Sequence, residues 1–329
     1  MKEYELEVLD QYDIEVRSTR KIRGAFFCDT NQGSLLLKEV HFSEKRAPLL
    51  YLLCEQLERN GYSNVDTPVL TKEGSYLSTY RDGTRYILKK WFSGKECDVK
   101  REQELIAAVR NLANLHQLMK WENKEMKPFT GRNLQEEYVR HNKELRKVRE
   151  FMRAKVNKGE FELLYLKYFE MMFEIAQNAQ NRLQESGYEE LHQKSMEEMW
   201  LVHGDYNYHN VLFLPGQLAT TNFESFHTDI QMADLYYFFR KVMEKHRWKH
   251  SLGRKLLQNY CEVRSLSNAE QEYLAIRLSY PEKFWKTANS YYHSNKAWIS
   301  EKSVEKLRIC IEQTEEKMHF IDHIFSFHL

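Results

Sequence analysis

A change in periodicity near Gly94 constrains the fold of this chain more than any other feature of its sequence. Before that glycine, short β-branched, aromatic or leucine-rich runs alternate with turns, a pattern typical of strands. After it, apolar residues recur every three or four positions, which is typical of amphipathic helices. We therefore predict an α+β chain with a small strand-rich N-terminal lobe, residues 1–93, and a large helical C-terminal lobe, residues 94–329.

The N-terminal lobe is predicted to contain several short strands and one helix. The expected strands are residues 14–18, 25–28, 34–38, 76–80 and 85–91, and the expected helix is residues 44–60. Residues 31–33 form a turn between the second and third strands, and Gly61 ends the helix because glycine accepts the left-handed conformation. This arrangement places Lys38 at the end of the third strand.

The helical lobe is predicted to contain a short β-like interruption. Helices are expected over residues 134–152, 161–183 and much of the aromatic segment 280–298, and short strands over residues 201–202, 211–214 and 220–223. The apolar stripe of residues 134–152 is explained by burial against a neighbouring helix, without any cofactor. We expect the aromatic segment to pack the lobe in the same way.

The charge of the chain is balanced. Lysine and arginine total 49 and aspartate and glutamate total 48, which gives a net charge of +1. Nucleic-acid binding through the aromatic segment 280–298 is therefore disfavoured, because stacking platforms normally accompany a basic groove. The sequence also has no apolar run of the roughly 18 residues that a membrane span needs. We expect neither a nucleic-acid nor a membrane partner.

The five cysteines are odd in number and scattered, without the paired spacing of a zinc or redox motif. We interpret them as free thiols in a reducing compartment. The first fifteen residues alternate charged and apolar side chains and lack the apolar core of a signal peptide. We therefore expect cytoplasmic synthesis with no signal peptide.

The stretch from residue 202 to residue 213 carries the clearest chemical signal. Asp205 is followed five positions later by Asn210, on a loop between two apolar runs. Such a carboxylate can accept a proton from a hydroxyl while the amide holds a metal ion bound to phosphate. The pattern H-x-D-x-x-x-x-N, which begins at His203, is that of a kinase catalytic loop. We expect His203 to be partly buried and hydrogen-bonded, so that it holds the loop rather than a metal.

Five segments, in order along the chain, resemble a known family. They are residues 37–46, 91–94, 112–116, 202–213 and 280–285. Through them the sequence resembles the aminoglycoside phosphotransferase and choline kinase superfamily, and more closely the CotS-type spore coat kinase-like proteins. The resemblance implies a bilobal protein-kinase-like fold with a small antiparallel-sheet N-lobe, a location in the spore coat, and a cleft for ATP and Mg²⁺.

The resemblance also assigns roles to individual residues. It implies that Lys38 contacts the α- and β-phosphates of the nucleotide, that Asp205 is the catalytic base, and that Asn210 is a magnesium ligand. We expect Lys38 and Asp205 to converge with Asn222, a residue of the second metal-binding loop, on one cleft.

Two further assignments concern the nucleotide side of the site. The resemblance implies that backbone groups of Lys90, Trp91 and Phe92 face the adenine as a hinge. Glu44 is the candidate helix carboxylate that would form an ion pair with Lys38. The alternative is that Lys38 has no such partner on the helix.

The second metal-binding loop departs from the family pattern. Asp229 and Asp234 match the spaced acids of the family, and this register puts Asn222 where the main magnesium carboxylate should stand. An amide can offer a carbonyl oxygen to a metal, but it removes one full negative charge from the site. Glu224, two residues further on, could reach the metal instead, or Asp205 could move into coordination.

Asn222 separates two functional hypotheses. The first is a degenerate kinase, or pseudokinase, that acts in assembly or binding within the spore coat. The alternative is an active ATP-dependent kinase that phosphorylates a hydroxyl, as aminoglycoside, choline and homoserine kinases do. The partners expected are a nucleotide, a small hydroxylated acceptor and other spore coat proteins.

Overall fold

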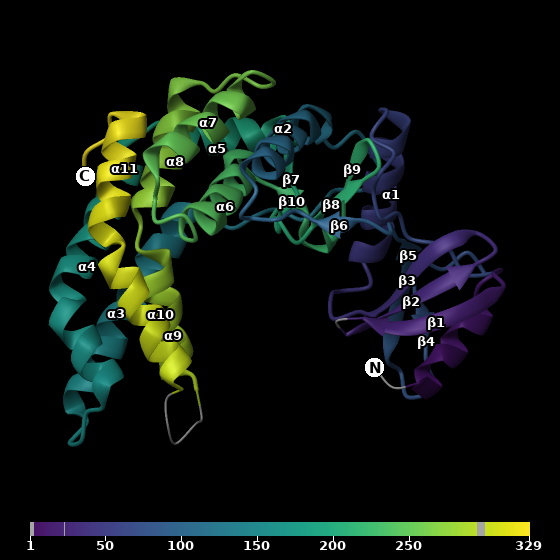
Figure 1. Ribbon diagram of the computed structural model, residues 1–329, viewed down its shortest axis with the longest axis horizontal. Coiled ribbons are helices and arrows are strands. Elements are labelled where there is room, and N and C mark those ends of the chain that lie inside the picture. Colours follow the sequence, from purple (N-terminus) through teal and green to yellow (C-terminus); the bar gives the residue numbers. More distant parts are fainter. Residues whose placement is uncertain (1–2, 23, 295–299) are drawn as a thin grey trace. The chain divides into compact units, whose positions relative to one another are not determined.

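The computed structural model of the protein describes residues 3–22, 24–294 and 300–329. The chain divides into two compact units, each of two segments (Figure 1). Unit 1 comprises Met1–Thr130 and Met199–Asp234, and unit 2 comprises Gly131–Glu198 and Leu235–Leu329. Unit 1 therefore gathers the N-terminal strands together with the segment that contains the predicted catalytic loop. The lobe boundary expected after residue 93 stays a prediction.

An antiparallel sheet of five strands forms the N-terminal part of unit 1, in the order β1-β2-β3-β5-β4. The strands are β1 (Val16–Ile22), β2 (Ala25–Thr30), β3 (Gly33–Glu39), β4 (Ser78–Thr79) and β5 (Arg85–Lys90). The predicted turn joins β2 to β3, where Gly33 adopts a φ of 97°. The predicted small antiparallel N-terminal sheet is confirmed.

The two faces of this sheet differ in chemistry. One face packs against η1 (Glu3–Gln11), a 3-10 helix that the sequence patterns did not predict, and its buried cluster includes Leu35, Leu37, Tyr86 and Leu88. Because side chains alternate along a strand, the neighbouring residues of β3 and β5 point to the opposite face. In that register Lys38 lies opposite Ile87, and Leu36 lies opposite Lys89. Lys38 and Lys89 therefore share the face that η1 does not cover.

The remainder of unit 1 combines two helices with two small sheets. The elements are α1 (Arg46–Arg59), α2 (Glu102–Leu118), β6 (Lys95–Glu96), β7 (Leu201–Val202), β8 (Val211–Leu214), β9 (Gln217–Thr220), η2 (Phe223–Ser225) and β10 (His227–Thr228). Gly61 follows α1 with a φ of 89°, as its predicted role in ending the helix requires. The β8–β9 hairpin pairs with β6, and β7 pairs with β10. The catalytic loop runs from β7 to β8.

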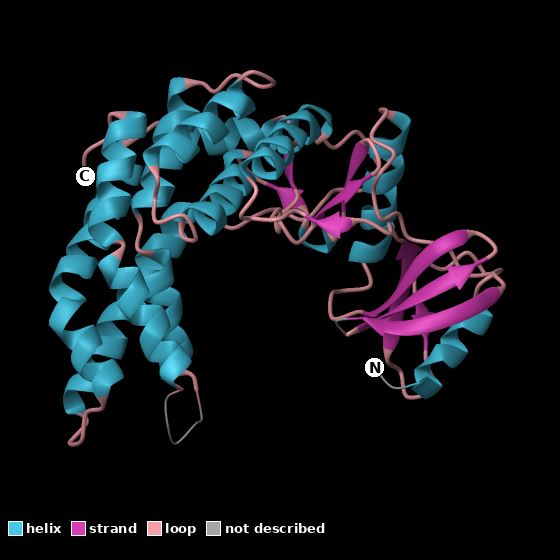
Figure 2. Cartoon of the chain, viewed as in Figure 1, coloured by secondary structure: helices cyan, strands magenta, loops and turns pink. Residues whose placement is uncertain are grey.

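Unit 2 is built from helices, which Figure 2 shows in cyan. They are α3 (Leu134–Ala154), α4 (Glu160–Glu185), α5 (Tyr188–Glu197), α7 (His250–Cys261), α8 (Asn268–Ser279), α9 (Glu282–Tyr292), α10 (Glu301–Glu312) and α11 (Thr314–Phe325); α6 (Met232–Met243) begins in unit 1. The predicted stripe of α3 is buried, and α3 packs against α4 and α9. Residues 295–299 of the predicted aromatic segment lie outside the described residues.

Candidate functional site

The catalytic loop is held by a buried histidine. His203 is fully buried; its Nδ1 accepts the Asp205 backbone N–H at 3.1 Å, and its Nε2 lies 3.0 Å from the Thr221 carbonyl oxygen. Since Nδ1 accepts, Nε2 carries the proton and donates to that carbonyl. The prediction that His203 holds the loop is confirmed, although its burial is complete rather than partial. Gly204 follows with a φ of 80°, and a Cβ there would collide with the Ser225 backbone carbonyl.

Asp234 anchors the start of the same loop from the first turn of α6. Its carboxylate accepts the backbone N–H groups of His203 at 2.6 Å and Gly204 at 2.9 Å, and lies 3.4 Å from His116 Nε2. Burial opposes ionisation, but the histidine and the backbone donors outweigh it and lower the pKa of Asp234. Asp234 is therefore a positioning residue, and its contact with His116 was not predicted from the sequence.

The side chains of Asp205 and Asn210 are locked together. Asp205 Oδ1 accepts a hydrogen bond from Asn207 Nδ2 and Oδ2 accepts one from Asn210 Nδ2, both at 3.0 Å. Asn210 Oδ1 in turn accepts a hydrogen bond from Asn222 Nδ2 at 2.8 Å. A continuous hydrogen-bonded chain thus joins the predicted base to both amides at the predicted metal position.

Asn222 occupies an unusual backbone conformation. Its φ of 67° and ψ of 50° are left-handed, a region that asparagine enters more readily than most residues. The strand expected over residues 220–223 is therefore wrong in its last part, because β9 ends at Thr220 and the chain turns into η2. The Asn222 backbone N–H donates to Asp66 Oδ2 at 2.7 Å, and a bridge between Val65 and Thr220 aligns the two segments.

Two lysines converge on Asn222 and Glu224, the two residues of the second loop that were predicted to hold a metal ion. Lys38 Nζ lies 3.0 Å from Glu224 Oε1 and 3.4 Å from Asn222 Oδ1. Lys89 Nζ lies 2.7 Å from the same glutamate oxygen and 3.1 Å from the same amide oxygen. Lys89 also lies 2.5 Å from Asp66 Oδ2. The structure thus brings Lys38 and Asn222 together as expected, and adds Lys89 and Asp66.

The charged groups of this cluster shift one another's pKa values, but burial outweighs Lys89 at Asp66, whose pKa is raised. The side chains of Lys89 and Asp66 are 1% and 2% exposed. Burial alone would lower the pKa of Lys89, but the carboxylates of Asp66 and Glu224 raise it above its ordinary range. Burial would likewise raise the pKa of Glu224, yet Lys89 and Lys38 hold it well below its usual value. The cluster is therefore a network of ion pairs.

Glu44 is not the partner of Lys38. Its carboxylate forms an ion pair with Arg85 at 2.8 Å, and its side chain is 73% exposed. The expected pairing is wrong, because Glu44, in the segment before α1, lies beside Arg85 at the start of β5. The carboxylate that reaches Lys38 is that of Glu224 in η2.

The expected hinge, Lys90–Trp91–Phe92, begins at the last residue of β5. The Lys90 backbone N–H donates to the Thr67 carbonyl at 2.9 Å, and the Trp91 backbone N–H donates to the Ser34 carbonyl at 2.9 Å. Two backbone donors of the segment Lys90–Trp91–Phe92 thus bond within the protein. Its contact with adenine stays a prediction.

The donor set does not suit a divalent cation as it is arranged. Mg²⁺ prefers carboxylate, carbonyl and water oxygens in a near-octahedral shell. Here Asn222 Oδ1 and Glu224 Oε1 already accept from ammonium groups, and Asn210 Oδ1 accepts from an amide. Within residues 3–22, 24–294 and 300–329, no cluster of three or more histidine, cysteine, aspartate or glutamate side chains could hold a metal ion.

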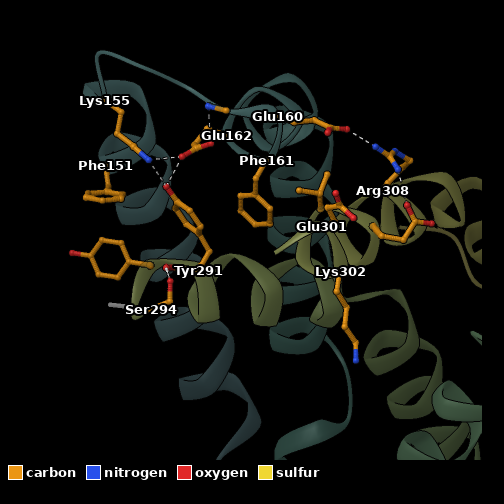
Figure 3. A pocket seen from close by; sticks show the side chains of 14 residues that line it. Phe151, Lys155, Glu160, Phe161, Glu162, Tyr291, Ser294, Glu301, Lys302 and Arg308 are labelled. Carbon is orange, nitrogen blue, oxygen red and sulfur yellow. Dashed lines mark hydrogen bonds and ion pairs between the residues drawn. The ribbon is translucent and has the colours of Figure 1, made fainter. Parts of the chain in front are cut away.

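A separate cavity of about 990 Å³ lies in unit 2, between the ends of α3, α4, α9 and α10 (Figure 3). It contains none of the predicted site residues. In its lining, the buried Glu162 carboxylate accepts hydrogen bonds from Lys155, from the Tyr291 hydroxyl at 2.7 Å and from the Gly159 backbone N–H at 3.0 Å. These groups satisfy one another, which indicates that the network joins α3, α4 and α9 rather than a ligand.

The described helices include none that is both long and apolar enough to cross a membrane.

Comparisons with known proteins agree with this geometry. Residues 5–324 match the family described as "Spore coat putative kinase YutH". Spore coat protein S of Bacillus subtilis (strain 168) is 22% identical, over 97% of this chain and 93% of that protein. A crystal structure of an aminoglycoside phosphotransferase from Alicyclobacillus acidocaldarius has a TM-score of 0.85 at 16% identity, covering 97% and 95% of the two chains. Spectinomycin phosphotransferase, in complex with ADP and spectinomycin, has a TM-score of 0.68 at 12% identity, covering 96% and 99%. The fold is therefore kinase-like.

Proposed function

The chain belongs to the spore coat kinase family, and on that premise we propose that it is a degenerate kinase of the spore coat. In this proposal its kinase-like site binds a nucleotide weakly, transfers phosphate slowly or not at all, and serves assembly or binding within the coat. The observation that carries the proposal is the state of the second metal-binding loop. Asn222 stands in place of a carboxylate, and its Oδ1 and the Glu224 carboxylate both accept from Lys38 and Lys89.

The physical argument concerns charge. Phosphoryl transfer spreads negative charge over the oxygens of the moving group, and catalysis depends on positioning and on electrostatic stabilisation. Mg²⁺, if bound, would supply that stabilisation, and Asn210, Asn222 and Glu224 are the side chains assigned to hold it. In the described arrangement Lys38 and Lys89 balance Glu224 and Asp66, which leaves Asp205 as the remaining carboxylate of the catalytic motif.

An active small-molecule kinase is the second candidate, and a specific observation favours it. Asp205 is oriented by Asn207 and Asn210 as a general base would need to be, at hydrogen-bond distances of 3.0 Å. Under this candidate ATP and Mg²⁺ would be the cofactors and a small hydroxylated molecule the acceptor. The fold neighbour crystallised with ADP and spectinomycin belongs to this class of enzyme.

The two candidates are separated by titrating the full chain with ATP, with and without Mg²⁺, while ATP hydrolysis is measured in parallel. The Asp205→Asn variant sets the background rate. The degenerate-kinase proposal predicts weak binding and a wild-type rate equal to that of Asp205→Asn. A wild-type rate well above this background, stimulated by Mg²⁺, would establish the active kinase instead.

The role in the spore coat needs its own measurement. Fractionation of spores from a strain that expresses the tagged chain should find it in the coat extract, as its family membership leads us to expect. The Asp205→Asn variant should reach the coat equally well, because assembly does not require phosphotransfer in this proposal. Loss of the variant from the coat would argue for an enzymatic role.

A further inference from the structure

Lys89 places a positive charge inside a ring of oxygen atoms. We propose that its ammonium group is the resident cation of this site, so that the protein itself fills the position that a divalent ion would take. The inference rests on the proposed degenerate kinase and extends it, since it says why the site would work without a metal.

The geometry around Lys89 Nζ resembles a coordination shell. Asp66 Oδ2, Glu224 Oε1 and Asn222 Oδ1 lie at 2.5, 2.7 and 3.1 Å from the nitrogen. An ammonium group has three N–H donors and no acceptor, so these three oxygens satisfy it completely. Two carboxylates and one amide carbonyl are also oxygen ligands that a hard divalent cation prefers.

The position of Lys89 is set by the fold rather than by a flexible side chain. Its backbone pairs with Leu36 of β3 on one side and forms a bridge with Pro68 on the other. Its side chain is 1% exposed, in contrast to Lys90, the next residue of β5, whose side chain is 49% exposed and pairs with Glu58. The buried lysine is therefore a built part of the site.

The net charge of the cluster determines whether a divalent cation can bind there. Lys38 and Lys89 carry two positive charges, which equal the two negative charges of Asp66 and Glu224. A divalent cation that entered beside them would meet two ammonium groups at short range. Removing the charge of Lys89 leaves one net negative charge and three oxygens that face a common point. That arrangement would attract a divalent cation.

The two lysines differ in their access to a nucleotide. Lys38 has a 40% exposed side chain and can contact a phosphate group, whereas Lys89 is enclosed. We expect the nucleotide to be bound as the free anion, with equal affinity in Mg²⁺ and in EDTA.

The test removes the Lys89 ammonium group and leaves its three oxygen partners, from Asp66, Glu224 and Asn222, in place. Lys89→Met removes the charge together with the terminal atom of the side chain, which vacates the Nζ position between the three oxygens, and Lys90→Met makes the same change at the exposed neighbour. Thermal unfolding of each full-length protein is followed in EDTA and in millimolar MgCl₂, CaCl₂ or MnCl₂, without nucleotide. We expect a metal-dependent rise in melting temperature of several degrees for Lys89→Met, and no such rise for wild type or Lys90→Met.

A second substitution identifies the ligands. Adding Asp66→Asn to Lys89→Met removes one carboxylate of the ring and should abolish the response to metal. A folded Lys89→Met protein that ignores all three metals would overturn the inference, as would a wild-type protein stabilised to the same extent.

Loss of a buried lysine could also prevent folding, and the experiment covers that case. If Lys89→Met is unfolded in EDTA, recovery of its helical circular dichroism on adding metal supports the inference. Lys89→Gln, whose amide retains a hydrogen-bond donor, is measured alongside; if neither variant responds to metal, the inference is wrong. Because no nucleotide is present, that failure leaves the proposed function untouched. Mg²⁺-dependent ATP turnover by wild type is a different result, and it would refute the proposed function together with the inference that rests on it.

Discussion

The two loops of the candidate site differ in what they retain of a kinase. The predicted catalytic loop has both motif residues, Asp205 and Asn210, and a buried scaffold. Asp234 accepts the backbone N–H groups of His203 and Gly204, and the His203 ring accepts that of Asp205. The predicted second metal-binding loop has an amide, Asn222, where the family resemblance leads us to expect a carboxylate, and at that residue the chain turns into η2. The hydrogen bonds that hold the first loop are thus present, whereas the negative charge expected in the second loop is reduced by one.

A chain can therefore keep the residues that shape a catalytic loop and still lack the charged residues that would hold a metal ion. The hydrogen bonds of the catalytic loop stabilise the fold whether or not phosphate is transferred, so a catalytic role is not needed to explain them. A cluster of carboxylates at a metal position, by contrast, destabilises the fold when no cation is bound, because like charges that are buried together repel each other. Only metal binding would therefore explain why such carboxylates are present. A comparison of the two loops by mutation can therefore distinguish scaffold from catalyst.

The largest effect is expected from removing the scaffold. Asp234→Ala would leave the buried backbone N–H of His203 and the partly buried backbone N–H of Gly204 without their acceptor. We expect a loss of about 3–5 kcal/mol in the free energy of unfolding, measured with urea. Asp229→Ala, the other spaced acid, is the control and should cost about 1 kcal/mol. Equal losses would mean that the catalytic loop is not anchored by Asp234.

The next effect concerns the ion pairs of Glu224. A carboxyl whose pKa is lower in the folded protein stabilises the fold above its ordinary value of 4.5, and this stabilisation is lost as the pH falls through the folded pKa. Glu224→Gln should therefore cost about 2–3 kcal/mol at neutral pH, as for hydrogen bonds to a charged group. Urea unfolding should show the difference from wild type shrinking below pH 4.5. A difference that does not change with pH would exclude this pairing.

The third effect is expected from Asn222→Asp, which introduces a carboxylate into the second loop. The added charge faces Lys38 and Lys89 and leaves the cluster with one net negative charge, which favours a divalent cation. We expect the metal-dependent part of ATP binding to tighten by about 1–3 kcal/mol, roughly 5- to 150-fold. Calorimetric titration with ATP at fixed Mg²⁺ measures it, and Asn207→Asp on the catalytic loop is the matched control.

Much of the fold was predictable because its signals are local. The turn at residues 31–33, the buried stripe of α3 and the end of α1 at Gly61 each depend on neighbours within a few positions. The helix η1 was missed, since its buried side chains in the core are Val8 and Leu9, followed by Tyr12 just after the helix, and this segment is too short for a clear period.

The site was predictable in its motif and not in its ion pairs. Asp205 and Asn210 could be identified from a short pattern, because their partners lie within that pattern. The burial of Lys89 depends on Asp66 and Glu224, which lie 23 and 135 positions away in the chain. One signal was available: strand alternation puts Lys89 on the same face as Lys38, and an enclosed lysine there requires carboxylates from elsewhere.

The smallest expected effect tests the edge of the second loop, at His227 in β10. Burial alone would lower the pKa of His227, but the Asp229 carboxylate at 3.6 Å and the Ser225 carbonyl at 2.8 Å raise it. A raised histidine pKa stabilises the fold fully below the ordinary value of 6.5, and the stabilisation is lost as the pH rises through the folded pKa. Wild type should therefore lose a little stability, under about 1 kcal/mol, on going from pH 6 to pH 8.5. Urea unfolding of His227→Gln should lack this loss, and Asp229→Asn, which removes the anionic partner, should reduce it. If His227→Gln kept the full wild-type slope, the group that titrates in this pH range would lie elsewhere than in β10.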